Sequence, residues 1–100
     1  MAHHVSSKAQ ADLDHIWYYL YKESGSAEVA DRQIDAITER IHLLGDHPFD
    51  GRARDDDLGP GRRSFPVDRY IIVYRVTGRD ADILRVAGSS QDIKALMSRR

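Results

Sequence analysis

The 100-residue sequence has no cysteine, which excludes disulfides and thiol chemistry and is compatible with a reducing compartment. It has no apolar run near the ~20 residues of a membrane span, and its N-terminus lacks the apolar segment of a signal peptide. A glycine-rich phosphate loop is also missing, because the GPGRR segment has neither the lysine nor the spacing of a P-loop. We therefore expect one globular domain over residues 1–100, located in the cytoplasm.

The spacing of histidine, serine and aspartate residues does not indicate a metal site, a cofactor site or a catalytic nucleophile. All five histidines lie in the first half, and only His3 and His4 are close together, where neighbouring strand residues point to opposite faces. Ser89 and Ser90 lack a nucleophile motif, and the aspartate run 55–57 reads as a solvated loop. We expect no metal, no cofactor and no catalytic residue.

The net charge of −1 hides an asymmetry between the two halves. Residues 1–50 hold four Lys/Arg against nine Asp/Glu, whereas residues 51–100 hold eleven against seven. Arginine supplies ten of those eleven cations, and guanidinium groups match carboxylate and phosphate oxygens. The basic half could therefore hold an anionic partner, or acidic helices could simply complement a basic sheet within one fold.

Three strands are predicted between residues 62 and 87. Residues 70–77 are almost wholly β-branched or aromatic, as a central strand should be. The preceding run contains Pro66, which lacks an N–H and so favours an edge position. Asp68-Arg69 suits a two-residue hairpin loop. After Gly78, a loop at residues 79–81 would return the chain into a third strand at residues 82–87.

Side-chain alternation gives this sheet an apolar face and a basic face. Tyr70, Ile72, Tyr74 and Val76 share the apolar face of the central strand. With the loops above, Tyr74 and Val76 meet Val86 and Leu84, whereas the other face places Arg62 and Arg85 opposite Arg75. We predict that Arg62, Arg75 and Arg85 bind a partner, because the facing strand positions carry no acid. The alternative is internal pairing with Asp80, Asp82 or the aspartate run.

The first half predicts a short edge strand and two helices. The strand covers residues 3–6. The first helix begins at an N-capping Ser7 and ends near Glu23, and the second runs over residues 27–44 with Gly45 as a left-handed cap. Residues 46–61 form a loop, and residues 91–100 form a last short helix. The fold class is α+β, a helical hairpin on one face of a small antiparallel sheet in the order β-α-α-β-β-β. The expected core is Leu13, Ile16, Trp17, Leu20, Ile34, Ile37, Ile41, Tyr74, Val76, Leu84 and Val86.

Tyrosines on the outer side of the first helix form a second candidate surface. Tyr18 and Tyr19 point away from the apolar stripe of that helix. Tyrosine is favoured in contacts between proteins, so we predict a partner-binding role for both. The alternative is an ordinary pair of tyrosines on a helix shoulder.

Five local signatures resemble the ParE branch of the RelE/ParE toxin superfamily of type II toxin–antitoxin systems. They are A-D-L-D-H-I-W at residues 11–17, H-P-F-D-G-R at 47–52, G-R-R-S at 61–64, I-V-Y-R-V at 72–76 and I-L-R-V at 83–86. The resemblance implies a small α+β toxin domain and a cognate antitoxin that wraps it. It also implies poisoning of DNA gyrase, without direct nucleic-acid binding outside a gyrase or ribosome complex.

RelE-type members of the superfamily instead cleave messenger RNA on the ribosome. That chemistry needs a general base and a general acid, for which a permanently protonated arginine is poorly suited. The three lysines lie outside the predicted sheet, and neither tyrosine nor histidine follows Tyr74. Where many relatives have Leu-His after the last strand, this sequence has Ala87-Gly88. A gyrase poison, a ribosome-dependent nuclease and an inactive relative that only binds its antitoxin remain the three hypotheses, in that order.

Overall fold

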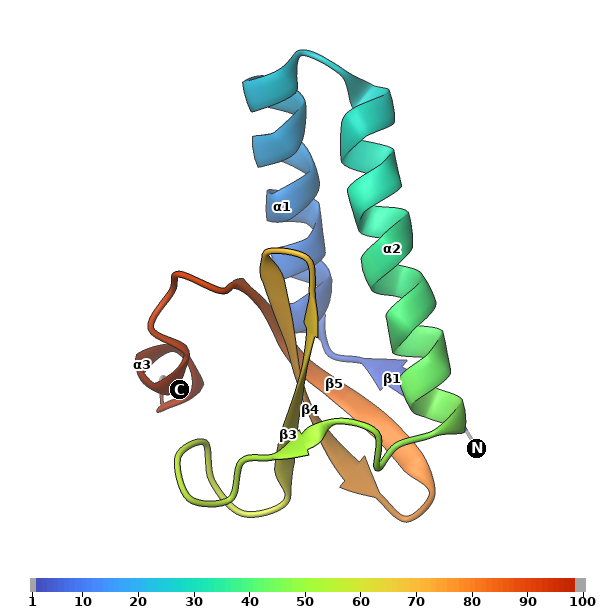
Figure 1. Ribbon diagram of the computed structural model, residues 1–100, viewed down its shortest axis with the longest axis vertical. Coiled ribbons are helices and arrows are strands. Elements are labelled where there is room, and N and C mark those ends of the chain that lie inside the picture. Colours follow the sequence, from blue (N-terminus) through green and yellow to red (C-terminus); the bar gives the residue numbers. More distant parts are fainter. Residues whose placement is uncertain (1, 99–100) are drawn as a thin grey trace.

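The computed structural model describes residues 2–98 and consists of a helical hairpin, a twisted sheet and a short terminal helix (Figure 1). The predicted α+β class and the hairpin are confirmed. The terminal helix begins at Ile93, two residues later than predicted, and the last two residues of the predicted span 91–100 lie outside the described part. The elements are β1 (His3–Val5), α1 (Ser7–Ser24), α2 (Ala27–Asp46), β2 (Arg52–Ala53), β3 (Arg62–Val67), β4 (Tyr70–Thr77), β5 (Asp80–Gly88) and α3 (Ile93–Ser98).

The sheet has five strands in the order β1-β5-β4-β3-β2. β1 runs parallel to β5, whereas the other neighbours are antiparallel, so the prediction of a purely antiparallel sheet was wrong. β2 was missed because it has only two residues, inside the segment expected to be a loop. Pro66 lies in β3 beyond the residues that β2 covers, so its missing N–H costs no ladder bond there.

One of the two predicted hairpin turns has the predicted length and the other does not. Asp68-Arg69 forms the predicted two-residue loop, with Val67 opposite Tyr70. The second turn is shorter than predicted, because Thr77 already pairs with Asp80 across Gly78-Arg79. Gly78 supplies the left-handed backbone of this turn, with φ of 65°. Asp80 and Ala81 therefore belong to β5 and not to the loop.

A β-bulge gives β5 a register that differs from the predicted one. Between Val73 and Tyr74 of β4 the pairing shifts by one, and Leu84 of β5 becomes the extra residue. Tyr74 faces Ile83, not Val86, and Arg75 faces Asp82, not Arg85. The core position predicted for Leu84 belongs to Ile83, which is fully buried while Leu84 is only half-buried.

The helix ends also differ in detail from the prediction. The N-cap of α1 is Ser6, whose hydroxyl accepts from the Ala9 N–H at 3.0 Å, and not Ser7. α2 continues past Gly45 and ends before His47, the residue that precedes a proline. Gly45 is thus helical and buried. Glycine suits the close approach of β1 here, because a Cβ at residue 45 would lie 3.2 Å from that of His3.

The main core lies between the hairpin and the apolar sheet face, as predicted. Ile37, Ile41 and Tyr74 are fully buried there, whereas Trp17 and Leu20 are only half-buried. The Trp17 indole donates to Asp31 at 2.7 Å at the core's border. The opposite sheet face has a second, smaller core under α3 and the segment before β3, formed by Leu58, Val73 and Ile93.

Candidate partner-binding surface

Strand alternation places three arginines on the sheet face opposite the main core, which we call the arginine face. Arg62 of β3 lies opposite Arg75 of β4, as predicted. Arg85 of β5 lies opposite Val73, one pair further along. Without the bulge, the pairing of the first part of β5 would place Arg85 opposite Ile72, on the core face. The extra residue Leu84 therefore keeps all three arginines on one face.

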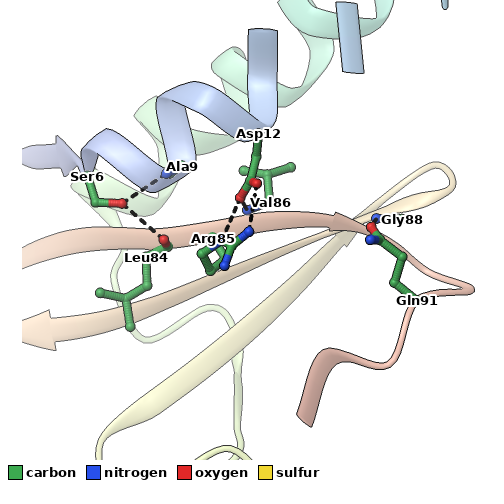
Figure 2. A network of polar contacts seen from close by, with 8 residues as sticks. All are labelled: Ser6, Ala9, Asp12, Leu84, Arg85, Val86, Gly88 and Gln91. Atoms are coloured by element: carbon green, nitrogen blue, oxygen red, sulfur yellow. Dashed lines mark hydrogen bonds and ion pairs between the residues drawn. The ribbon is translucent and has the colours of Figure 1, made fainter. Parts of the chain in front are cut away.

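Arg85 is neutralised inside the molecule (Figure 2). Its Nε and Nη2 atoms donate to the two carboxylate oxygens of Asp12 in α1, at 2.8 and 2.9 Å, and the Val86 N–H donates to the same carboxylate at 2.9 Å. The Arg85 and Asp12 side chains are only 18% and 13% exposed, and the hydrogen bonds to Asp12 raise the pKa of Arg85. The expectation of no acid at the facing strand positions was wrong for Arg75, which lies opposite Asp82. Arg85 faces Val73, and its acid is Asp12, outside the strands. Asp12 lies in another element, so strand alternation could not reveal it.

The side chains of Arg62 and Arg75 differ in their exposure and in the hydrogen bonds they already make within the molecule. Arg62 is half-buried, and its Nη1 donates to the Leu58 carbonyl at 2.7 Å. Its Nε is buried and has no partner among residues 2–98. Arg75 is exposed, and its side chain makes no hydrogen bond or ion pair within that same part of the chain. Arg75 is therefore the arginine of this face that is best placed to meet an outside anion.

The aspartate run beside the arginine face is partly structural. Asp57 forms a close ion pair with Arg54, whose Nη2 lies 2.6 Å from a carboxylate oxygen. The hydrogen bonds between them lower the pKa of Asp57 and raise the pKa of Arg54. Asp55 accepts the Gly61 N–H at 3.0 Å. These aspartates fix the segment before β3 and leave Arg75 unpaired.

A hollow of about 320 Å³ joins the arginine face to the start of α1. Arg62 and Arg85 line it together with Lys8, a cation that the strand pattern could not place there because it lies in α1. The apolar part of its wall comes from β5 and α3, and no acidic side chain lines it. Carboxylates next to apolar side chains would complement such a surface. The remaining lining residues are Ser6, Ser7, Leu84, Leu96 and Met97.

The tyrosines of α1 lie apart from this hollow. Tyr18 and Tyr19 are 56% and 60% exposed, as expected for side chains on the outer side of the helix. Tyr19 borders a separate open groove of about 730 Å³, whose wall includes Arg69 and Tyr70. Burial raises the pKa of Tyr70, with a smaller contribution from Tyr19. The structure thus brings Arg62 together with Arg75 and Arg85, and leaves the tyrosines as a second surface.

Among residues 2–98, no helix is long and apolar enough to cross a membrane. Within the same residues no group of three or more His, Asp or Glu side chains is arranged to hold a metal ion. Histidines occur at residues 3, 4, 15, 42 and 47, in β1, α1, α2 and the residue after it, and not on the arginine face.

Comparison with known proteins places the chain among the toxins of type II toxin–antitoxin systems. It belongs to the ParE toxin family, because the family model described as "ParE toxin of type II toxin-antitoxin system, parDE" matches residues 4–93. Toxin ParE3 of Caulobacter vibrioides is 33% identical over 89 residues, which cover 89% of this chain and 87% of that protein. Toxin ParE1 of the same organism is 33% identical over 93 residues, covering 91% and 92%.

A solved structure supports the same assignment. A chain from the structure titled "Chromosomal ParDE TA system from P. aeruginosa" superposes with a TM-score of 0.76 at 28% identity. The match covers 88% of the present chain and 95% of the other one. The fold is therefore shared over nearly its whole length.

Proposed function

We propose that this chain is a toxin that binds and poisons DNA gyrase in the cytoplasm and is neutralised by a cognate antitoxin. Membership of the ParE family is the observation that carries the proposal. The gyrase target is proposed because the chain resembles the ParE branch of the superfamily. The antitoxin partner is proposed because the structurally similar chain comes from a structure titled as a ParDE system.

The chemistry of the arginine face favours a binding poison over a nuclease. RNA cleavage requires groups that give and accept protons, and the face presents arginines, which stay protonated. Tyr74 is the nearest phenol in sequence to these arginines, but it lies on the core face. Its hydroxyl donates to the Pro48 carbonyl and accepts the Gly51 N–H, and burial raises its pKa. It is therefore unsuited to act as a base.

Expression without antitoxin tests the target. We expect growth arrest, with inhibited gyrase supercoiling in a purified assay and intact messenger RNA. Messenger RNA cut at ribosomal A-site codons, with gyrase unaffected, would replace the gyrase proposal by the nuclease hypothesis. Normal growth at high expression would support an inactive relative that retains only antitoxin binding.

We further propose that the antitoxin places a segment with carboxylates and apolar residues on the arginine face. Arg75 is exposed and unpaired within the described residues, and the neighbouring hollow combines cations with an apolar wall. Tyr18 and Tyr19 would extend the contact along α1. A short gene beside this one that encodes an acidic protein would supply the natural partner for the measurement.

Arg75→Ala should weaken antitoxin binding without affecting the fold. Loss of one hydrogen bond to a charged group costs about 1.5–3 kcal/mol, or roughly 10- to 150-fold in Kd. Isothermal titration calorimetry measures the change. Arg32→Ala is the matched control, because Arg32 is an exposed arginine of α2 whose pairing with Glu28 is also exposed. Equal affinity of Arg75→Ala and the control would exclude this arginine from the contact.

A further inference from the structure

Phe49 is the most exposed large apolar side chain in the described part of the chain, at 67%. It lies in the turn between α2 and β2, within the H-P-F-D-G-R segment that resembles the toxin family. Isolated exposed apolar residues are common on protein surfaces. The informative feature here is that the turn is fixed from both sides, so the ring is held away from the core.

The inner side of the turn is fixed by Tyr74 of β4. The wholly buried Tyr74 donates its hydroxyl hydrogen to the Pro48 carbonyl at 2.7 Å and accepts the Gly51 N–H at 2.8 Å. Gly51 is necessary for this contact, because a Cβ there would overlap the hydroxyl. The two bonds flank Phe49 on both sides in the chain. The backbone that carries the ring is thus tied to the central strand of the sheet.

The outer side is fixed by Arg63 of β3. Its Nη1 donates to the Gly51 carbonyl at 2.7 Å, and its guanidinium lies over the Phe49 ring, 5.1 Å from the centroid. Phe65 is the next side chain on that face of β3, and Arg40 of α2 lies over its ring at 4.4 Å. Leu43, 38% exposed, shares a hollow with Phe65 and Arg40. We call these five residues the Phe49 strip.

The charges of the Phe49 strip are not neutralised by ion pairs. Glu39 and Asp68 line the same hollow as Arg40, but within residues 2–98 neither Arg40 nor Arg63 makes an ion pair with a carboxylate. A strip of apolar rings and unpaired guanidinium groups has the composition of interface hot spots, in which aromatic and arginine side chains dominate. Because the backbone that carries the ring is already fixed, less conformational entropy is lost when a partner covers Phe49 than for a residue in a free loop.

We propose that the Phe49 strip is the surface through which the toxin holds its folded protein target. Phe49 enters an apolar pocket of the target, and carboxylates at the rim of that pocket meet Arg40 and Arg63. A projecting, preorganised ring needs a concave partner, which a folded protein offers. An extended antitoxin segment instead needs a concave surface on the toxin, such as the hollow lined by Lys8, Arg62 and Arg85.

Phe49→Ala tests this inference, which rests on the proposed function because the target is taken to be gyrase. The half-inhibitory concentration in the supercoiling assay should rise by at least about tenfold, as expected for a hot-spot residue. Growth arrest on expression should weaken in parallel. Antitoxin affinity should stay within about twofold, because exposed substitutions outside an interface change little. Arg40→Glu should also weaken target binding, since it repels the rim carboxylates.

Val29→Ala is the matched control, because it removes another exposed apolar side chain of α2. Unchanged thermal unfolding of the Phe49 variant would confirm that the fold is intact. If Phe49→Ala inhibits gyrase and arrests growth as strongly as the wild type, the inference is wrong while the proposed function stands. If Phe49→Ala loses antitoxin affinity instead, the strip belongs to the antitoxin interface. A wild-type chain that arrests growth without inhibiting gyrase refutes the gyrase target, and the growth readout of Phe49→Ala then still tests the strip.

Discussion

Replacing Arg85 by alanine removes the ion pair that joins α1 to β5. The variant leaves the Asp12 carboxylate with one donor, the Val86 N–H, in a site that is largely shielded from water. Breaking a fully buried pair costs about 3–5 kcal/mol, and a hydrogen bond to a charged group about 1.5–3 kcal/mol. Because the pair is partly exposed and Asp12 keeps one bond, we expect a loss of roughly 2–3 kcal/mol in the free energy of unfolding.

Urea unfolding followed by circular dichroism measures this loss directly, and the melting temperature should fall by roughly 10–20 °C for a domain of this size. Asp12→Ala should cost more than Asp12→Asn, because an asparagine oxygen can still accept the Val86 N–H. A double-mutant cycle between Arg85→Ala and Asp12→Ala isolates the coupling. A loss below about 0.5 kcal/mol, the size of an ordinary surface substitution, would refute the structural role of Arg85 and leave its charge free for a partner.

Two further substitutions test local features of the fold. Gly51→Ala should destabilise the protein by about 1–3 kcal/mol, measured by thermal unfolding, because its Cβ would overlap the fully buried Tyr74 ring; a wild-type melting temperature would contradict this. The Ala2 N–H, and next the His4 side chain, lower the pKa of Asp80. Its stabilising contribution is therefore present above the unfolded-state pKa near 4 and is lost as the pH falls through the lower folded-state value. Asp80→Asn should flatten the stability profile in that acidic window, and an unchanged profile would show that the contacts of this carboxylate contribute nothing.

The sequence predicted the fold correctly where residue type and side-chain alternation within one segment determine its conformation. The strand at residues 70–77 was predicted because its β-branched and aromatic residues favour a strand. The Asp68-Arg69 turn was predicted because these two residues separate two strand-like runs. The register of β5 was not predictable, because Ile83 and Leu84 are both apolar and either can fill the core position. Only the assembled sheet distinguishes them, through a short turn at Gly78 and the bulge that follows.

In the candidate site too, contacts within neighbouring strands were predictable and contacts between distant segments were not. Alternation correctly placed Arg62 opposite Arg75, because both strands flank a tight hairpin. The partner of Arg85 is 73 residues away in sequence, and no local rule connects the two. Phe49 was overlooked because irregular segments have no period, and its exposure depends on a tyrosine in the central strand. The H-P-F-D-G-R segment was noted for its resemblance alone.

The pairing of β1 with β5 has a consequence for the toxin during its synthesis. The first strand emerges from the ribosome early, but its only neighbour among the described strands is the last one made. Before β5 has been synthesised, β1 cannot join the sheet and Asp12 cannot form its ion pair with Arg85. Because Arg85 lies in β5, the three arginines share one face only after β5 has paired with β4.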